Sequence, residues 1–197
     1  IKVQPMAHFM MGGIKTTADT STDIKGLFCC GEVTGGLHGA NRLAGHALTE
    51  TAVFGPIAGE QAARFAKGQG RLCANIREDT IQWRPTLGQY SLTDINNQIR
   101  GLLWESAGIV RNGTCLEKAK KNTESIAEQI YELKPASLRP WLECHNMIKT
   151  SMAIINSALL REESRGAHYR VDFPQESPQW RGNVIIKNNK TVFQSQL

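Results

Sequence analysis

Two short polar stretches near the start of the chain combine side chains that bind anions with glycines that admit a ligand. In the first, His8 lies four residues before the adjacent Gly12 and Gly13. In the second, residues 35–46 hold four glycines together with two histidines, an asparagine and Arg42. An arginine fork can bond both oxygens of a carboxylate, and adjacent glycines let backbone lie close to a flat ligand. These residue types favour a carboxylate-binding site beside a planar group.

Both stretches also have an ordinary structural interpretation. A histidine beside a glycine turn usually has a structural role, and an arginine and an asparagine before a helix often serve as caps. A helix that begins just after Arg42 would add the positive end of its dipole to either arrangement. The residues alone leave both interpretations open.

The elements that must position these residues are expected within the first 67 residues. The apolar run Leu27–Cys30 is long enough only for a buried strand, and it stops at Gly31. Apolar residues at spacings of three and four predict a helix from about Leu43 to Lys67. We expect Pro56 to kink this helix or to break it near Phe54.

Three further helices are expected after a glycine- and proline-containing connector at residues 68–90. Their apolar spacing places the first helix around Ile95–Leu103, and the other two at about 116–133 and 138–160. We expect Thr93 or Asp94 to cap the first helix and Gly108 to end it. Pro135 should end the second. The inward face of the second helix is predicted to carry Ile126, Ile130 and Leu133.

A hairpin is expected at the end of the chain, where the apolar triplets 184–186 and 191–193 flank Asn188-Asn189. The expected fold is therefore α/β plus α: strands and a helix, then a three-helix bundle, then a terminal β-hairpin. The expected division is residues 1–67 for the first domain, 68–90 for the connector, 91–165 for the bundle and 166–197 for the tail.

Composition excludes several classes of protein. With 41% hydrophobic and 21% charged residues, the 197-residue chain should fold rather than stay disordered. Five cysteines without a CxxC spacing argue against a zinc site or disulfide framework and indicate a reducing compartment. The net charge of +5 is not gathered into a nucleic-acid-binding face. No apolar stretch approaches the roughly 20 residues of a membrane helix.

Three spaced motifs are similar to signature regions of the fumarate reductase/succinate dehydrogenase flavoproteins, a family that also includes L-aspartate oxidase. The first motif comprises Pro5, His8 and Met11–Ile14. The second comprises Gly31, Glu32, His38–Leu43, Gly45 and Leu48. The third comprises Ser164–Arg170 with Asp172–Pro174. Their order and spacing make the resemblance specific over most of the chain.

The resemblance implies FAD as cofactor and a four-carbon dicarboxylate as substrate. His8 and Arg42 would hold the substrate carboxylates over the flavin, and hydride would pass between flavin N5 and the C=C bond. The implied FAD-binding residues are Gly12 and Gly13 at the isoalloxazine ring, Glu32 at the ribityl or ribose hydroxyls, Asn41, and the backbone of Ala47 and Leu48 at the pyrimidine edge. No metal ligand is expected.

The resemblance covers the carboxy-terminal portion of such an enzyme and has one departure. The family usually has Asn-Ser where this chain has His46-Ala47, which places a titratable group near the flavin. The general acid and the dinucleotide fingerprint lie upstream in the family, so this chain alone is expected to be inactive. The implied partners are that upstream FAD and capping domain and an iron–sulfur subunit. The implied location is cytoplasmic, or peripheral at the inner face of a membrane through partner subunits.

Two alternatives accompany this interpretation. The first is L-aspartate oxidase, which shares the motifs but typically keeps the Asn-Ser pair. The second is a helical docking module for an iron–sulfur partner, without catalysis. For Ser164–Tyr169 a structural loop that packs the helical bundle onto the flavin domain is favoured over contact with the rest of the enzyme or with an iron–sulfur partner.

Overall fold

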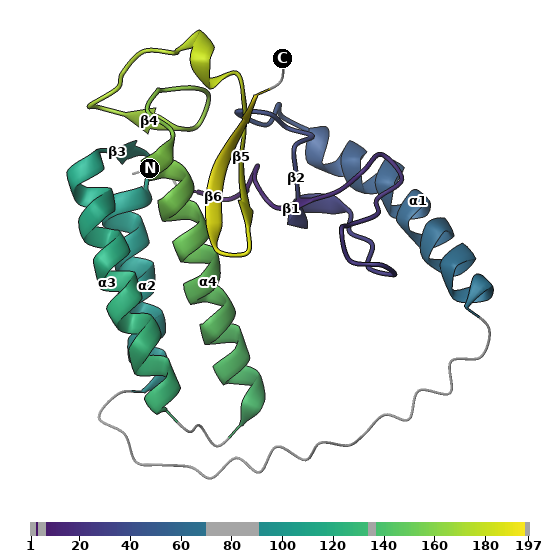
Figure 1. Cartoon of the computed structure of the whole chain (residues 1–197), viewed down its shortest axis with the longest axis horizontal. Coiled ribbons are helices and arrows are strands. Elements are labelled where there is room, and N and C mark those ends of the chain that lie inside the picture. Colours follow the sequence, from purple (N-terminus) through teal and green to yellow (C-terminus); the bar gives the residue numbers. More distant parts are fainter. Residues whose placement is uncertain (1–2, 4–6, 70–90, 134–136, 196–197) are drawn as a thin grey trace. The chain divides into compact units, whose positions relative to one another are not determined.

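The computed structural model describes residues 3, 7–69, 91–133 and 137–195 (Figure 1). The chain divides into two compact units, Ile1–Glu78 and Asp79–Leu197, and each is described by itself. Pro5, Pro135 and nearly all of the predicted connector, residues 70–90, lie outside the described residues.

The first unit brings two short parallel strands together beside one long helix. Strand β1, Ile14–Lys15, pairs with β2, Thr34–Gly35, which follows a single 3₁₀ turn at Gly31–Val33. The strands approach so closely that a Cβ on Gly13 would lie 2.3 Å from the carbonyl oxygen of Val33. Only glycine permits that approach.

Helix α1 spans His46–Gly68 and runs through Pro56 without interruption (Figure 1). The expectation of a break near Phe54 is therefore wrong. Proline removes the hydrogen bond to the carbonyl four residues earlier, that of Ala52. Pro56 is exposed, so water can satisfy that carbonyl and the helix continues.

The buried strand expected at Leu27–Cys30 is also wrong. Of these residues only Phe28 makes a β-bridge, to Ser21, and Leu27 is 42% exposed. The apolar run packs against a helix instead of a sheet, because the Phe28 and Phe65 rings meet edge to face with centroids 6.1 Å apart.

The second unit is a three-helix bundle with two small pairs of strands, and the bundle is as predicted (Figure 1). Its helices are α2 (Leu92–Ala107), α3 (Gly113–Glu132) and α4 (Leu138–Leu160). Its strands are β3 (Val110–Arg111) parallel to β4 (Tyr169–Arg170), and β5 (Gly182–Lys187) antiparallel to β6 (Lys190–Ser195), with a 3₁₀ turn at Pro178–Trp180.

The bundle core has two contiguous clusters along the helices. One gathers Ile95, Ile99, Ile126, Ile130, Leu133, Cys144 and Ile148, and the other gathers Ala107, Leu116, Ala119, Ile155 and Ala158. The predicted inward face of the second helix is confirmed, since Ile126, Ile130 and Leu133 are all buried. No helix in the described part of the chain is long and apolar enough to cross a membrane.

The helix ends show which capping predictions hold. Gly108 ends α2 as expected, but the N-cap is Ser91 rather than Thr93 or Asp94. The Ser91 hydroxyl accepts from the Asp94 N–H at 3.1 Å, and the Asp94 carboxylate accepts from the Ser91 N–H at 3.3 Å. Asp94 is thus the reciprocal partner in a capping box.

The predicted terminal hairpin is confirmed. Val184 pairs with Phe193 and Ile186 with Thr191 across β5 and β6. Asn188 and Asn189 have φ values of 51° and 60°, the left-handed conformation that a two-residue type I′ turn requires.

Candidate functional site

Arg42 and His8, distant in sequence, meet in the first unit. The Arg42 Nη2 donates to the His8 Nε2 across 3.0 Å. The Arg42 guanidinium carbon also lies 4.3 Å from the ring centroid of Phe9, which is a cation–π distance. The structure therefore brings together the two residues predicted to hold the substrate.

One donor of Arg42 has no acceptor. Its Nε is buried and lacks a hydrogen-bond partner in the described part of the chain. Nε and Nη2 lie on the same edge of a guanidinium, the edge that grips a carboxylate with two parallel hydrogen bonds. An unsatisfied buried donor costs about 1–3 kcal/mol, so this edge is suited to an acceptor supplied by a ligand.

The direction of the Arg42–His8 bond follows from the chemistry of the two groups. Arginine has no acceptor, so the His8 Nε2 must be unprotonated to receive this bond. A carboxylate between the two side chains would be an alternative acceptor for both, because it can accept from the guanidinium and from a protonated imidazole alike.

The start of α1 offers unused backbone donors. Gly45 is the N-cap, with φ 81°, and no side chain caps the helix. Of the first-turn amides, that of His46 bonds to the Leu43 carbonyl at 3.2 Å. Leu48 is 79% exposed. A 23-residue helix that begins without a side-chain cap can donate backbone N–H groups to a polar or anionic ligand. This geometry fits the contacts predicted for Ala47 and Leu48.

The other residues predicted to contact FAD differ in how accessible they are and in the contacts they already make. A Cβ on Gly12 would meet no atom within 4 Å, so the chain is open there, whereas Gly13 is already required by the strand pairing. Glu32 is exposed and accepts from the Met10 N–H through Oε1 at 3.0 Å. Asn41 is exposed as well. These positions fit a bound FAD, and the individual roles stay predictions.

Sequence reasoning missed a buried carboxylate in the same unit as Arg42 and His8. Glu50, on the second turn of α1, is only 4% exposed. Its Oε1 accepts from the Thr34 hydroxyl at 3.0 Å, and its Oε2 lies 2.9 Å from the His38 Nε2. An acidic residue three positions after Ala47 and four before Phe54 falls on the predicted apolar stripe. That placement was the available signal.

Glu50 and His38 line a hollow of about 230 Å³ in the first unit. The other lining residues are Leu37, His46, Thr49, Val53 and Phe54. His46, the departure from the family pattern, is exposed and its Nδ1 lies 3.3 Å from the Ala44 carbonyl.

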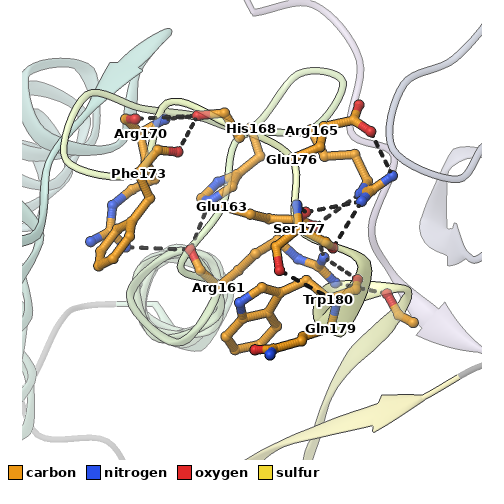
Figure 2. Close-up of polar contacts among 12 residues, drawn as sticks. Arg161, Glu163, Arg165, His168, Arg170, Phe173, Glu176, Ser177, Gln179 and Trp180 are labelled. Carbon is orange, nitrogen blue, oxygen red and sulfur yellow. Dashed lines mark hydrogen bonds and ion pairs between the residues drawn. The ribbon is translucent and has the colours of Figure 1, made fainter.

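The third motif lies in the second unit, around a fully buried carboxylate (Figure 2). Glu163 accepts from Arg161 at 2.6 Å, from Arg165 at 2.9 and 3.0 Å, and from the Ser177 N–H at 2.8 Å. Burial raises the pKa of Glu163, but the hydrogen bonds from Arg165, Ser177 and Arg161 outweigh it and hold the pKa at about 2.

Arg170 joins the ends of two helices of the bundle. Its Nη1 donates to the Ala158 and Leu159 carbonyls at the end of α4, at 2.8 and 3.2 Å. Its Nη2 donates to Asp172 at 2.6 Å, and Asp172 in turn accepts from the Gly113 N–H at the start of α3. The Arg170 hydrogen bond lowers the pKa of Asp172. These contacts tie the motif to the helices of the bundle, and packing onto the flavin domain stays a prediction.

His168 is half-buried in the same corner. Its Nδ1 accepts from the Arg111 Nη1 at 2.8 Å and its Nε2 donates to the Arg161 carbonyl at 3.1 Å. Burial is the main cause that lowers the pKa of His168 to about 4, although the hydrogen bond to Arg161 opposes it. Both ring nitrogens are thus engaged by the bundle.

Comparison with known proteins decides the family. A family model described as the fumarate reductase flavoprotein C-terminus matches residues 96–194, about half of the chain. The chain belongs to the fumarate reductase/succinate dehydrogenase flavoprotein family. A second model, the FAD binding domain, matches residues 1–48. The family resemblance inferred from the three motifs is confirmed.

Relatives and a solved structure agree with this assignment. The chain is 40% identical to an uncharacterized FAD-dependent oxidoreductase of Methanocaldococcus jannaschii, over 98% of this chain and 37% of that protein. It is 36% identical to one subunit of the CoM/CoB fumarate reductase of Methanothermobacter marburgensis, over 94% of this chain and 36% of that protein. L-aspartate oxidases are also among its relatives.

The fold is that of a fumarate reductase flavoprotein. A variant of the E. coli quinol fumarate reductase FrdA superposes with a TM-score of 0.80 at 27% identity, over 98% of this chain and 37% of that one. The predicted fold class, strands and a helix followed by a three-helix bundle and a hairpin, is confirmed. The chain spans a little over a third of the length of these relatives.

Proposed function

We propose that this chain is part of an FAD-dependent oxidoreductase that interconverts fumarate and succinate, or a closely related dicarboxylate. The observation that carries the proposal is the clamp formed by Arg42 and His8, with a buried Arg42 Nε that lacks an acceptor on the gripping edge. Membership of a family of FAD-dependent oxidoreductases supplies the reaction class.

The clamp explains why the substrate would be a dicarboxylate. Arg42 would bind one carboxylate through its Nε and Nη2 edge, and His8 would donate to a carboxylate from the facing segment. Binding that twists a carboxylate out of the plane of a C=C bond polarises the bond and favours the transition state. The chain would thus bind the dicarboxylate and orient it for the reaction.

FAD would bind along the same face of the first unit. Gly12 is open to a flat ring, Glu32 has a second carboxylate oxygen for a hydroxyl, and the start of α1 presents N–H groups beside Ala47 and Leu48. Bound FAD would accept or supply the hydride. Gly13 and Asn41 would complete the FAD contacts.

The remaining parts of the enzyme would come from outside this chain. The general acid is proposed to lie in a capping domain of the same enzyme, and electrons would pass to an iron–sulfur subunit. The methanogen relative is named as one subunit of a fumarate reductase, and others are named as flavoprotein subunits. We propose that the enzyme works in the cytoplasm or at the inner face of a membrane.

The test compares two activities of the FAD-loaded full-length enzyme that contains this chain. One assay follows fumarate reduction by a reduced artificial donor, and the other follows L-aspartate oxidation by oxygen. The proposal expects fumarate turnover to exceed aspartate turnover by at least about tenfold. Aspartate oxidation as the faster reaction would identify an L-aspartate oxidase, the alternative that the relatives also allow. A full-length protein that does not retain FAD and turns over neither substrate would favour the docking-module alternative.

A further inference from the structure

Arg42 lies in the loop between β2 and α1, which is rich in glycine. Gly36, Gly39 and Gly45 have φ values of 110°, 54° and 81°, which non-glycine residues rarely adopt. Glycines raise the conformational freedom that must be lost when the loop is ordered. A long arginine side chain adds about 2 kcal/mol of rotamer entropy of its own. Some contact must therefore fix Arg42 before it can act as a clamp.

Phe9 supplies that contact for the guanidinium. The ring lies under the guanidinium at the 4.3 Å separation noted above, and it also meets the edge of the His38 ring, with centroids 5.3 Å apart at 75°. Phe9 follows His8 directly in the sequence. One aromatic ring thus contacts both His38 and Arg42, which lie four residues apart on the glycine loop.

His38 is in turn held by Glu50. The His38 and Glu50 side chains are 5% and 3% exposed, and the His38 Nε2 lies 2.9 Å from the Glu50 Oε2, within hydrogen-bond distance. A carboxylate that bonds one nitrogen of a histidine fixes the tautomer and the ring orientation. The Thr34 hydroxyl, which also lies 2.8 Å from the Gly31 carbonyl, anchors the other carboxylate oxygen.

A buried carboxylate needs a reason to be there. Burying a charge costs several kcal/mol unless hydrogen bonds and a partner compensate. An apolar side chain at the Glu50 position would continue the stripe of α1 without that cost. Glu50 instead forms the first link of a contact series that runs through His38 and Phe9 to Arg42.

We propose that Glu50 is a positioning residue for the substrate clamp. Glu50 orients the His38 ring, and both His38 and Arg42 contact the Phe9 ring. The Phe9 ring in turn sets the plane of the Arg42 guanidinium that faces His8. This inference rests on the proposed function, because it assigns a role toward the same dicarboxylate. Glu50 does not touch the substrate; it acts through the two rings.

The test uses the FAD-loaded full-length enzyme and titrates succinate and fumarate while following the flavin absorbance. Glu50→Leu is expected to raise both dissociation constants by roughly 10- to 100-fold, because an unfixed Arg42 must be ordered on binding. Glu50→Gln still accepts a hydrogen bond from His38 and should recover affinity to within about threefold of wild type. FAD content per folded protein should not change.

A double-mutant cycle separates positioning from general stability. Phe9→Leu removes the ring contacts and should weaken dicarboxylate binding about tenfold, while Phe9→Tyr keeps them. If both residues act through one contact series, the effects of Phe9→Leu and Glu50→Leu are not additive. The dissociation constant of the double variant should then exceed that of the single variant with the lower affinity by no more than about threefold. If Glu50→Leu does not fold, Glu50→Ala, which also removes the acceptor for His38, provides the cycle with Phe9→Leu.

Glu60 is the matched control. It lies on the same helix and pairs with Arg64 at an exposed position, so Glu60→Leu should leave both dissociation constants unchanged. Wild-type affinity in Glu50→Leu, or additive effects in the cycle, would overturn the positioning role and leave the proposed function intact. A wild-type enzyme that binds neither dicarboxylate would overturn both.

Discussion

Arg42 and Arg170 show two uses of the same side chain. The Arg170 guanidinium is saturated, with two helix carbonyls and Asp172 as acceptors. Arg42 has a buried donor without an acceptor and an imidazole in place of a carboxylate. A saturated arginine holds a fold together, whereas one with an open donor edge is prepared for a ligand. This difference supports a structural role for Arg170 and is consistent with the binding role proposed for Arg42.

The sequence motifs locate both arginines but do not show which one is structural and which one is suited to a ligand. Each sits in a motif of small and polar residues, and either environment is compatible with a cap or a packed corner. What separates them is the set of acceptors, and those come from residues far away in sequence, such as Ala158 for Arg170 and His8 for Arg42. Glu50 escaped notice for the same reason, since its partners Thr34 and His38 belong to β2 and to the loop that follows it.

At the residue scale, Glu163→Gln should strongly destabilise the second unit. Arg161 and Arg165 both donate to this fully buried carboxylate, and removing the charge leaves two guanidinium groups without compensation. We expect a loss of about 3 kcal/mol in the free energy of unfolding. Urea unfolding of the chain, followed by tryptophan fluorescence, measures it through Trp104, Trp141 and Trp180.

Glu143→Gln is the control for this substitution. Glu143 pairs with Arg139 on the surface of α4, where the two side chains are 63% and 87% exposed. Removing its charge should change the unfolding free energy by less than about 0.5 kcal/mol. Equal effects of the two substitutions would contradict the buried-network interpretation of Glu163.

At the element scale, apolar periodicity was sufficient to predict the helices, and the turn residues were sufficient to predict the hairpin. The α2 cap was missed by two or three residues because Ser91 and Asp94 exchange hydrogen bonds, and the spacing alone does not say which of them is the cap. The strand predicted at Leu27–Cys30 failed for a different reason. A four-residue apolar run fits a strand or a packed coil equally well, and only the position of Phe65 decides between them.

The capping box predicts a difference between two serines. Ser91→Ala should cost about 1 kcal/mol in the free energy of unfolding, because the Asp94 N–H loses its acceptor. Ser137, the N-cap of α4, makes no side-chain capping bond, so Ser137→Ala should cost only a few tenths of that. The same urea titration measures both. A larger loss for Ser137→Ala would show that the assigned caps are wrong.

At the scale of the whole molecule, the core and the site are separate. Among the described residues, every buried apolar side chain lies in the second unit, while the clamp and the buried Glu50 lie in the first. The second unit is therefore held by ordinary apolar packing plus the Glu163 and Arg170 networks. The first is held by close strand approach, glycine turns and polar links.

The second unit should lose stability in acid in two steps. The pKa of His168 falls from its ordinary 6.5 to about 4 in the fold, so the unfolded chain binds a proton between those values that the folded chain does not. Stability is then lost as pH falls from about 6.5 to 4, by up to about 3 kcal/mol. The pKa of Glu163, lowered from 4.5 to about 2, adds a further loss between those two values.

Urea midpoints measured between pH 7 and pH 4 test the first step. The wild-type midpoint should fall steadily over this range. His168→Gln has no imidazole to protonate, so it should be less stable at pH 7 and show a flatter profile down to about pH 4.5. Parallel profiles for the two proteins would mean that His168 does not cause the loss.

The most direct test of the whole account is a fumarate titration of the FAD-loaded full-length enzyme, followed by flavin absorbance. The wild type should show a saturable spectral change, and Arg42→Lys should weaken fumarate binding by roughly 100-fold with FAD content unchanged, because lysine lacks the two-donor edge. Arg64→Lys, at an exposed ion pair on the same unit, should match the wild type. Wild-type affinity in Arg42→Lys would contradict the carboxylate clamp.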